Sequence, residues 1–152
     1  MLIEFVYAIS YHISMESFHS KTNTFSRNLT AFFDARLEQF GLATSYVELM
    51  ILLKRSDDFS QKELAQYLSL APSTITRFID KLEKQGYVKK VRKGREAYTG
   101  LTENGRKVSE EMESVYKSAV EDLKEIVGEK FVITVGKLLD FGNGVLKEAK
   151  ED

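Results

Sequence analysis

The stretch from residue 60 to residue 101 constrains this chain most, because it places two short helical patterns directly before a basic hairpin pattern. Ser60 and Glu63 have the spacing of a capping box, in which each side chain bonds a free backbone N–H at the start of a helix. Pro72 suits the first position of a second helix, since the N–H that proline lacks is not needed there. The sequence therefore predicts two helices joined by a tight turn, with the second running from about residue 72 to residue 85.

The second of these helices is predicted to have one apolar and one polar face. Its apolar residues recur at the i, i+3, i+4, i+7 spacing of a buried stripe, namely Ile75, Phe78, Ile79 and Leu82. The opposite side carries Ser73, Thr76, Arg77, Asp80 and Lys84, with Thr74 and Lys81 on one flank. Gly86 can adopt the left-handed conformation that ends such a helix. This pattern predicts a helix that presents short polar side chains and an arginine to its surroundings.

Two short strands are predicted after this helix, at residues 87 to 91 and 97 to 101, joined by the sequence Arg-Lys-Gly-Arg-Glu. Gly94 can take a positive φ at the hairpin tip. A helix-turn-helix followed by a basic hairpin is the plan of a winged helix-turn-helix. An α-helix fits the major groove of DNA, and a basic hairpin beside it can reach the backbone or the minor groove. The alternative is that the polar side of the helix is only a solvated surface.

The charge distribution favours the DNA-binding interpretation. The whole chain has 22 Lys+Arg and 23 Asp+Glu, for a net charge of −1, so the protein as a whole does not attract DNA. Residues 77 to 107 nevertheless contain ten basic and four acidic residues, a net charge of +6, which leaves −7 for the rest of the chain. A basic patch on an acidic protein both attracts and orients the molecule toward phosphates.

Composition predicts one domain, residues 1 to 152, without disulfides. Hydrophobic residues make up 43% of the chain, which is enough for a core, and there is no cysteine. The first residues lack the basic region and the cleavage site of a signal peptide, and no apolar run is long enough to span a membrane. We therefore expect a cytoplasmic protein without a membrane partner or a cofactor. An enzyme is not expected, because neither a phosphate-binding glycine loop nor a nucleophile pattern is present.

Helices are predicted on both sides of the central winged helix lobe, which spans residues 45 to 101. Residues 3 to 40 look mostly helical and carry an aromatic-rich stripe of Phe25, Leu29, Phe32, Phe33, Leu37 and Phe40. A helix at residues 45 to 55 is expected to start with a second capping box, formed by Ser45 and Glu48.

A long amphipathic helix is predicted from about residue 103 to residue 127, with Thr102 as its cap, and a last helix from about residue 130 to residue 150. The apolar surfaces of the two terminal regions, 1 to 40 and 103 to 152, exceed what one small lobe needs. We expect them to hold a homodimer, which would present two recognition helices to half-sites ~34–36 Å apart. The predicted fold is therefore mainly α, with a small β-hairpin wing and dimerisation helices at both ends.

The chain resembles the MarR family of bacterial transcriptional regulators in the order of its elements. The resemblance is strongest from residue 60 to residue 105, over Gln-Lys-Glu-Leu-Ala at 61 to 65, Ser-Thr-Ile-Thr-Arg at 73 to 77, and Leu-Glu-Lys-Gln-Gly-Tyr-Val at 82 to 88. Leu-Thr-Glu-Asn-Gly at 101 to 105 is similar to the sequence that opens the family's dimerisation helix. The resemblance implies a homodimer that binds a near-palindromic operator in double-stranded DNA, usually as a repressor that a small aromatic ligand releases.

The same resemblance assigns DNA contacts to the second helix and to the wing. The predicted DNA-binding residues are Ser73, Thr74, Thr76, Arg77, Lys81, Arg92, Lys93 and Arg95. Arg95 stands where the family has the arginine of an Asp-x-Arg motif in its wing, but Lys93 occupies the position of the aspartate. Because that aspartate helps to fix the arginine, Arg92 or Lys93 could share its role here.

Two further interpretations remain beside this one. His12, Glu16 and His19 would share one face of a helix at a spacing that can hold a metal ion, although two ordinary polar histidines are the simpler explanation. A winged helix can also serve only for contact with another protein, in which case its binding would depend weakly on salt. The sequence assigns no residue to an effector site, and the effector is unknown at this point.

Overall fold

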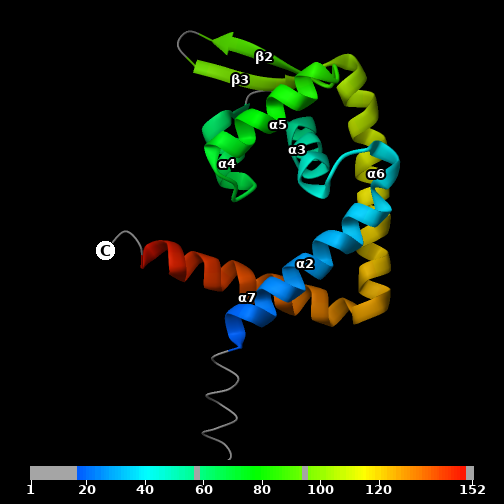
Figure 1. The fold of residues 1–152 in the computed structure, drawn as a ribbon, viewed down its shortest axis with the longest axis vertical. Coiled ribbons are helices and arrows are strands. Elements are labelled where there is room, and N and C mark those ends of the chain that lie inside the picture. Colours follow the sequence, from blue (N-terminus) through cyan, green and yellow to red (C-terminus); the bar gives the residue numbers. More distant parts are fainter. Residues whose placement is uncertain (1–16, 57–58, 94–95, 150–152) are drawn as a thin grey trace, which may run out of the picture. The chain divides into compact units, whose positions relative to one another are not determined.

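The computed structural model describes residues 17–56, 59–93 and 96–149, drawn in colour in Figure 1. The chain divides into two compact units, Met1–Thr44 and Ser45–Asp152, and each is described by itself. In the part of the chain that the structure describes, no helix is both long enough and apolar enough to cross a membrane.

The first unit contains helix α2 (Phe18–Arg36) and the short 3-10 helix η1 (Glu38–Phe40). Of the predicted aromatic-rich stripe, Phe33 and Leu37 are buried, at 7% and 0% exposure, while Phe25 remains exposed. Residues 3 to 16 of the region predicted to be mostly helical lie outside the described residues. In the remainder, the helix is interrupted at Leu37, where the chain leaves the helical conformation and tightens into η1. Gly41 then closes this turn with a φ of 62°, a conformation that glycine adopts without steric penalty.

The second unit is mainly helical and contains a three-stranded sheet. Its elements are α3 (Thr44–Arg55), β1 (Phe59–Ser60), α4 (Gln61–Tyr67), α5 (Pro72–Lys84), β2 (Val88–Lys93), β3 (Glu96–Leu101), α6 (Glu103–Val127) and α7 (Glu129–Glu148). Thr44, the first residue of α3, belongs to the first unit. This order confirms the predicted winged helix-turn-helix, and the bounds of α6 match the predicted long helix.

The sheet is antiparallel in the order β1-β3-β2, and β1 was not predicted from the sequence. Strands β2 and β3 form the predicted hairpin, in a register that pairs Lys90 with Thr99. Strand β1 adds only two residues, of which Phe59 pairs with Thr99. It ends at once because Ser60 is also the N-cap of α4, where it forms the predicted capping box with Glu63. Periodicity could not have revealed a strand of two residues.

The predicted capping box of Ser45 and Glu48 is wrong. Helix α3 starts one residue earlier, and the Asp34 carboxylate accepts hydrogen bonds from the Thr44 backbone N–H (2.7 Å) and the Thr44 hydroxyl (2.6 Å). Glu48 instead accepts a hydrogen bond from the Tyr116 hydroxyl of α6, 3.0 Å away. A partner ten residues upstream therefore replaces the local cap that the spacing predicted.

The core of the second unit lies between α3, α4, α5 and α6, and it holds the winged helix lobe in place. Its fully buried side chains include Leu49, Met50 and Leu53 from α3, Leu64 from α4, Ile75, Ile79 and Leu82 from α5, and Met112 from α6. The stripe predicted on the second helix is confirmed except for Phe78. That ring is half-buried because it stacks on Tyr46, with 3.9 Å between the ring centroids.

A hydrogen-bonded junction connects the residues just before β2 to the start of α6. The Thr102 hydroxyl donates to the Gly86 carbonyl oxygen at 2.6 Å and accepts from the Gly105 N–H at 2.9 Å. The Thr102 N–H bonds the Tyr87 carbonyl oxygen at 2.9 Å. A Cβ added at Gly105 would lie 1.8 Å from that same oxygen. The Leu-Thr-Glu-Asn-Gly sequence therefore combines a helix cap with a position where only glycine fits.

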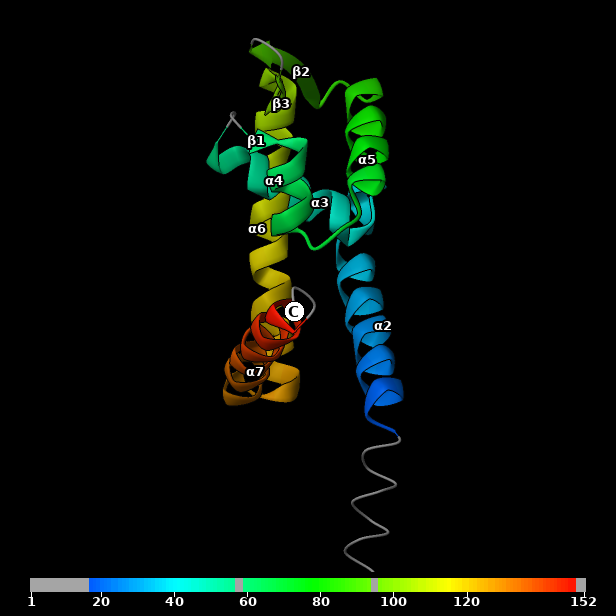
Figure 2. The same cartoon turned by 90° about the vertical axis from the view of Figure 1, so that its left-hand side faces the viewer.

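Helices α6 and α7 follow one another at an angle around Gly128, as Figures 1 and 2 show. Gly128 has a φ of 90° and ends α6 as predicted. Helix α7 buries none of its residues in this chain. Its large apolar side chains are exposed, among them Leu138 (63%), Leu139 (50%) and Leu146 (64%). An apolar helix that its own chain leaves uncovered is a surface that another protein can bury.

Candidate nucleic-acid interface

The outward side of α5 is polar and accessible. Ile75, Ile79 and Leu82 are 0% exposed and hold the helix on the core, while Ser73, Thr76 and Arg77 are exposed on the other side. Thr74, predicted on the flank, is half-buried. Arg77 makes no hydrogen bond or ion pair with any residue that the structure describes. Its guanidinium is therefore available to a partner outside the chain.

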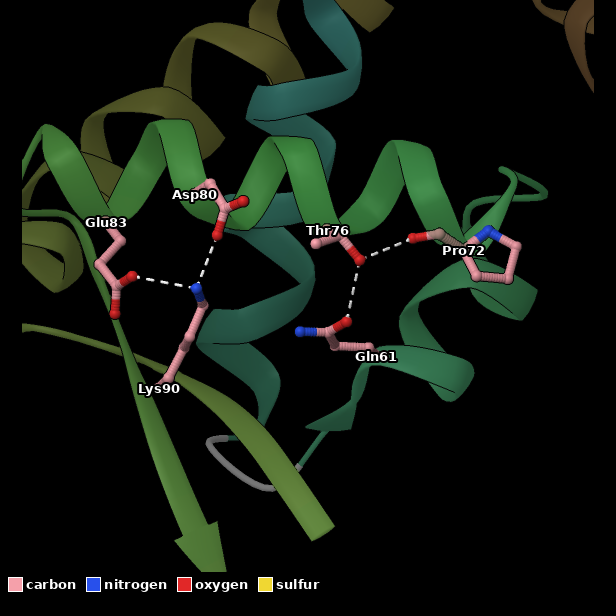
Figure 3. A network of polar contacts seen from close by, with 6 residues as sticks. All are labelled: Gln61, Pro72, Thr76, Asp80, Glu83 and Lys90. Carbon is pink, nitrogen blue, oxygen red and sulfur yellow. Dashed lines mark hydrogen bonds and ion pairs between the residues drawn. The ribbon is translucent and has the colours of Figure 1, made fainter.

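Thr76 is held toward the neighbouring helix. Its hydroxyl lies 3.1 Å from Gln61 Oε1 at the start of α4 and 3.1 Å from the Pro72 carbonyl oxygen, as Figure 3 shows. A hydroxyl has one proton, so it donates to one of these oxygens at a time and keeps its lone pairs for other donors. The sequence did not identify Gln61, because only the packing of α4 against α5 brings it to Thr76.

The basic stretch predicted from the sequence is partly neutralised by its own acids. Lys90 Nζ on β2 lies 2.6 Å from Asp80 Oδ1 and 3.1 Å from Glu83 Oε2, both on α5 (Figure 3). The hydrogen bond that Lys90 donates to Asp80, followed by the one it donates to Glu83, raises the pKa of Lys90 above its usual value. Lys90 therefore links the wing to the helix and is not a free cation on the surface.

Several other cations of this stretch remain exposed on α5 and β2. They are Lys81, Lys84, Lys89 and Arg92. The Lys81 ammonium lies 4.7 Å from the centroid of the Tyr46 ring, which places it by a cation–π contact. Tyr46 is a further residue that the sequence did not single out. Arg95 and the side chain of Lys93 lie outside the described residues, so their predicted contacts stay predictions.

Only one of the three predicted metal-ligand candidates lies in the described part of the chain. His12 and Glu16 lie outside the described residues, and His19 is exposed on α2. The side-chain nitrogen of Asn23 lies 3.2 Å from His19 Nε2. Among residues 17–56, 59–93 and 96–149, no three histidine, aspartate or glutamate side chains are grouped as metal ligands.

A pocket of about 290 Å³ lies next to this lobe, between α3, α4 and α6. Its lining is mainly apolar and aromatic, with two charged groups, and consists of Glu48, Ile51, Leu52, Arg55, Tyr67, Leu68 and Tyr116. Burial raises the pKa of Glu48, and the hydrogen bond from Tyr116 opposes that shift. Burial also raises the pKa of Tyr116 above its usual value, with the neighbouring Glu48 carboxylate adding to the shift. The pocket can therefore take a small ring and offers both a carboxylate and a guanidinium to its substituents.

Comparison with known proteins gives matches in sequence and in fold. A model of the MarR family matches residues 43–95. The uncharacterized HTH-type transcriptional regulator YwoH of Bacillus subtilis (strain 168) is 36% identical over 80 residues, which are 51% of this chain and 58% of that protein. The chain thus spans little more than half the length of this curated relative.

Solved structures match over a larger part of the chain. The S. aureus MepR–DNA complex has a TM-score of 0.74 at 19% identity, covering 85% of this chain and 97% of that one. NadR in complex with 4-hydroxyphenylacetate also has a TM-score of 0.74 at 19% identity, covering 87% of this chain and 98% of that one. At these identities the likeness establishes the fold alone.

Proposed function

We propose that this chain, whose residues 43–95 match the MarR family, is a DNA-binding transcriptional regulator of that family and acts as a homodimer. The observation that carries the proposal is the outward side of α5, where Ser73, Thr76 and Arg77 are exposed on a helix fixed by fully buried residues. A rigid helix with accessible hydroxyl groups, and with a guanidinium that no described residue pairs, suits the recognition of base edges in the major groove.

The wing provides the second part of the proposed interface. Arg92 is exposed near the tip of the hairpin, and Lys93 and Arg95 follow it in sequence. We propose that these cations bind the phosphate backbone or the minor groove beside the site of α5, since both attract arginine. Lys81, placed by Tyr46 on the flank of α5, is suited to a phosphate at the groove edge.

The proposed dimer uses the apolar side of α7 together with the end of α6. Phe131, Val135, Leu138, Leu139, Val145 and Leu146 share one side of α7 at helical spacing. On α6, Ile126 is 66% exposed close to the junction with α7. Burying these side chains against a second copy would remove a large apolar area from water. A two-fold dimer would also suit a near-palindromic operator with two half-sites.

Replacing Leu138 by aspartate should prevent dimer formation. Burial of one leucine side chain contributes about 1.5–3 kcal/mol, and two-fold symmetry counts it twice. Sedimentation equilibrium at micromolar protein concentration should give the mass of a monomer for Leu138→Asp and the mass of a dimer for the unmodified protein. Lys147→Asp is the matched control, because it introduces the same acid on the opposite side of α7 and should stay dimeric. If the Leu138→Asp protein were still dimeric, this side of α7 would not form the dimer interface.

We propose that a small aromatic ligand regulates DNA binding through the pocket beside the winged helix lobe. Its volume of about 290 Å³ is close to the lower limit of small-molecule sites, so it suits a single ring. Helix α3 and helix α6 both line it. A ligand bound there can therefore change how the lobe sits on α6, and release of the operator would then relieve repression.

Filling this pocket should remove the response to ligand and leave DNA binding intact. Single-ring aromatic acids and amines, such as benzoate and benzylamine, would be screened for release of the protein from operator DNA. Leu52→Trp places a larger side chain in the pocket, and we expect it to reduce release by any active compound at least tenfold. Release that is equal in Leu52→Trp and in the unmodified protein would place the ligand elsewhere.

Fluorescence anisotropy on the DNA upstream of the protein's own gene, with scrambled DNA beside it and over a series of salt concentrations, tests the proposal directly. A regulator should bind the upstream DNA selectively, and its affinity should fall steeply with salt because phosphate contacts release counterions. Where that fragment is inactive, a duplex selected from a random-sequence pool replaces it. Failure to bind any DNA in a salt-dependent way would instead favour a winged helix used for contact with another protein.

A further inference from the structure

We propose that Lys90 is a positioning residue that clamps the wing to the recognition helix α5, and that it does not itself bind DNA. The proposal rests on the DNA-binding function proposed above and names a residue that sets the geometry of that interface. Neither the predicted DNA-binding residues nor the family resemblance singled out Lys90. The clamp consists of Lys90 on β2 and the two carboxylates Asp80 and Glu83 on α5.

The geometry shows a single cation shared by two acids from another element. Lys90 Nζ is 2.6 Å from Asp80 Oδ1 and 3.1 Å from Glu83 Oε2, and Figure 3 shows the ammonium between them. Asp80 and Glu83 are three residues apart on α5, so they lie on the same side of the helix. The side chains of all three are partly shielded, at 38%, 47% and 42% exposure. Two of the three ammonium protons are thus occupied within the protein.

Helix α5 and strand β2 also pack against each other, so the clamp acts across an existing contact. Side chains two residues apart in a strand point to the same face of a sheet. Arg92 therefore leaves β2 on the same face as Lys90, which is the face directed at α5. When Lys90 is held on α5, the position of the Arg92 side chain is therefore also set relative to the polar side of α5.

The clamp also reduces the electrostatic repulsion between α5 and DNA. Two carboxylates on the recognition helix would repel the phosphates of a bound duplex, as like charges do at short distance. Lys90 neutralises one of these charges and draws both toward the wing. The net effect is that acids on α5 serve to orient the wing, while the exposed cations Arg77, Lys81 and Arg92 remain for DNA.

Affinity for operator DNA as a function of salt separates a clamp from a phosphate contact. We expect Lys90→Ala to weaken operator binding about tenfold with an unchanged salt slope, since no counterion-releasing contact is lost. The double variant Asp80→Lys with Lys90→Glu keeps one cation and two carboxylates with the charges exchanged, and it should restore affinity to within about threefold. Lys117→Ala is the control, because it removes a lysine paired with Glu113 on α6, far along the chain from the wing.

Two results would overturn the proposal. A salt slope that falls by about 1 in Lys90→Ala, with no rescue by the charge exchange, would show that Lys90 binds a phosphate itself. Unchanged operator affinity in Lys90→Ala would show that the clamp does not position the wing.

Hydrogen exchange of the DNA-free protein tests the clamp without relying on DNA binding. Backbone amides of β2 and β3 should exchange several-fold faster in Lys90→Ala than in Lys117→Ala, and the charge exchange should slow them again. Equal exchange in the two single variants would show that no clamp exists. Faster exchange in a protein that binds no DNA would retain the clamp while rejecting the proposed function.

Discussion

Replacing Arg77 by alanine is expected to weaken specific operator binding by about 1–3 kcal/mol, which is the range for losing one good base contact. The reason is local to α5. Arg77 is exposed, it makes no ion pair with any described residue, and it lies one residue after Thr76, whose position is fixed by Gln61. A guanidinium has a planar fork of donors that matches the two acceptors of guanine in the major groove. Titration of operator DNA with the variant, measured by fluorescence anisotropy, gives the loss directly.

Two controls separate base reading from general attraction to DNA. Arg77→Lys keeps the charge and loses the fork, so it should recover binding to scrambled DNA and only a small part of the specific affinity. Binding of Arg77→Ala to scrambled DNA should fall less than its binding to the operator. Equal losses on both duplexes would reassign Arg77 to the phosphate backbone, and unchanged operator affinity would remove it from the interface.

Replacing Gly105 by alanine is expected to be the most destabilising substitution at the junction of β2 and α6. The new Cβ would lie 1.8 Å from the carbonyl oxygen of Tyr87, and that atom belongs to the backbone. The oxygen cannot turn away easily, because it accepts the Thr102 N–H at 2.9 Å. Overpacking typically destabilises by about 1–3 kcal/mol, and a contact this short places Gly105→Ala at or above the upper end. Thermal unfolding should shift downward by roughly 6–12 °C or more.

Gly136→Ala provides the matched control for this prediction. Gly136 lies within α7, and an added Cβ would meet no atom within 4 Å. Alanine is the better helix former by about 0.8–1.0 kcal/mol, so this variant should unfold at the same or a slightly higher temperature. If Gly105→Ala also unfolded at an unchanged temperature, the junction would be able to relax and the glycine would have another role.

Gly105 also connects stability with the proposed function. The junction that it allows sets the start of α6 against Gly86 and Tyr87, which lead from α5 into β2. Helix α5, the wing and helix α6 thus meet at this junction. A shift there would move α5 and the wing relative to α6, so operator affinity should fall in Gly105→Ala even at temperatures where the variant is folded.

Much of the fold could be predicted because its signals are local. The capping box of Ser60 and Glu63, the proline at the start of α5 and the positive φ of Gly86 each depend on residues within one helical turn. The apolar stripe of α5 and the length of α6 follow from periodicity over one continuous segment. The order of these elements was sufficient to identify the winged helix-turn-helix.

The incorrect and missing predictions concern contacts between distant segments. The capping box of Ser45 and Glu48 was replaced by Asp34 at one end and by Tyr116 at the other, and both partners are remote in sequence. The pocket beside the lobe draws residues from α3, α4 and α6 and leaves no spacing signal. A sum of charges over residues 77 to 107 could not reveal that Lys90 is engaged by Asp80 and Glu83.

The sequence by itself determined the order of the helices, the bounds of α5 and α6 to within a residue, and which side of α5 is polar. These properties follow from backbone conformation and from periodicity, which are set by neighbours in the chain. Only the tertiary structure decided which cations are paired, because an ion pair depends on distances of a few ångström between elements. It also decided that no residue of α7 is fully buried in its own chain, since an apolar stripe has the same sequence pattern whether or not another segment covers it.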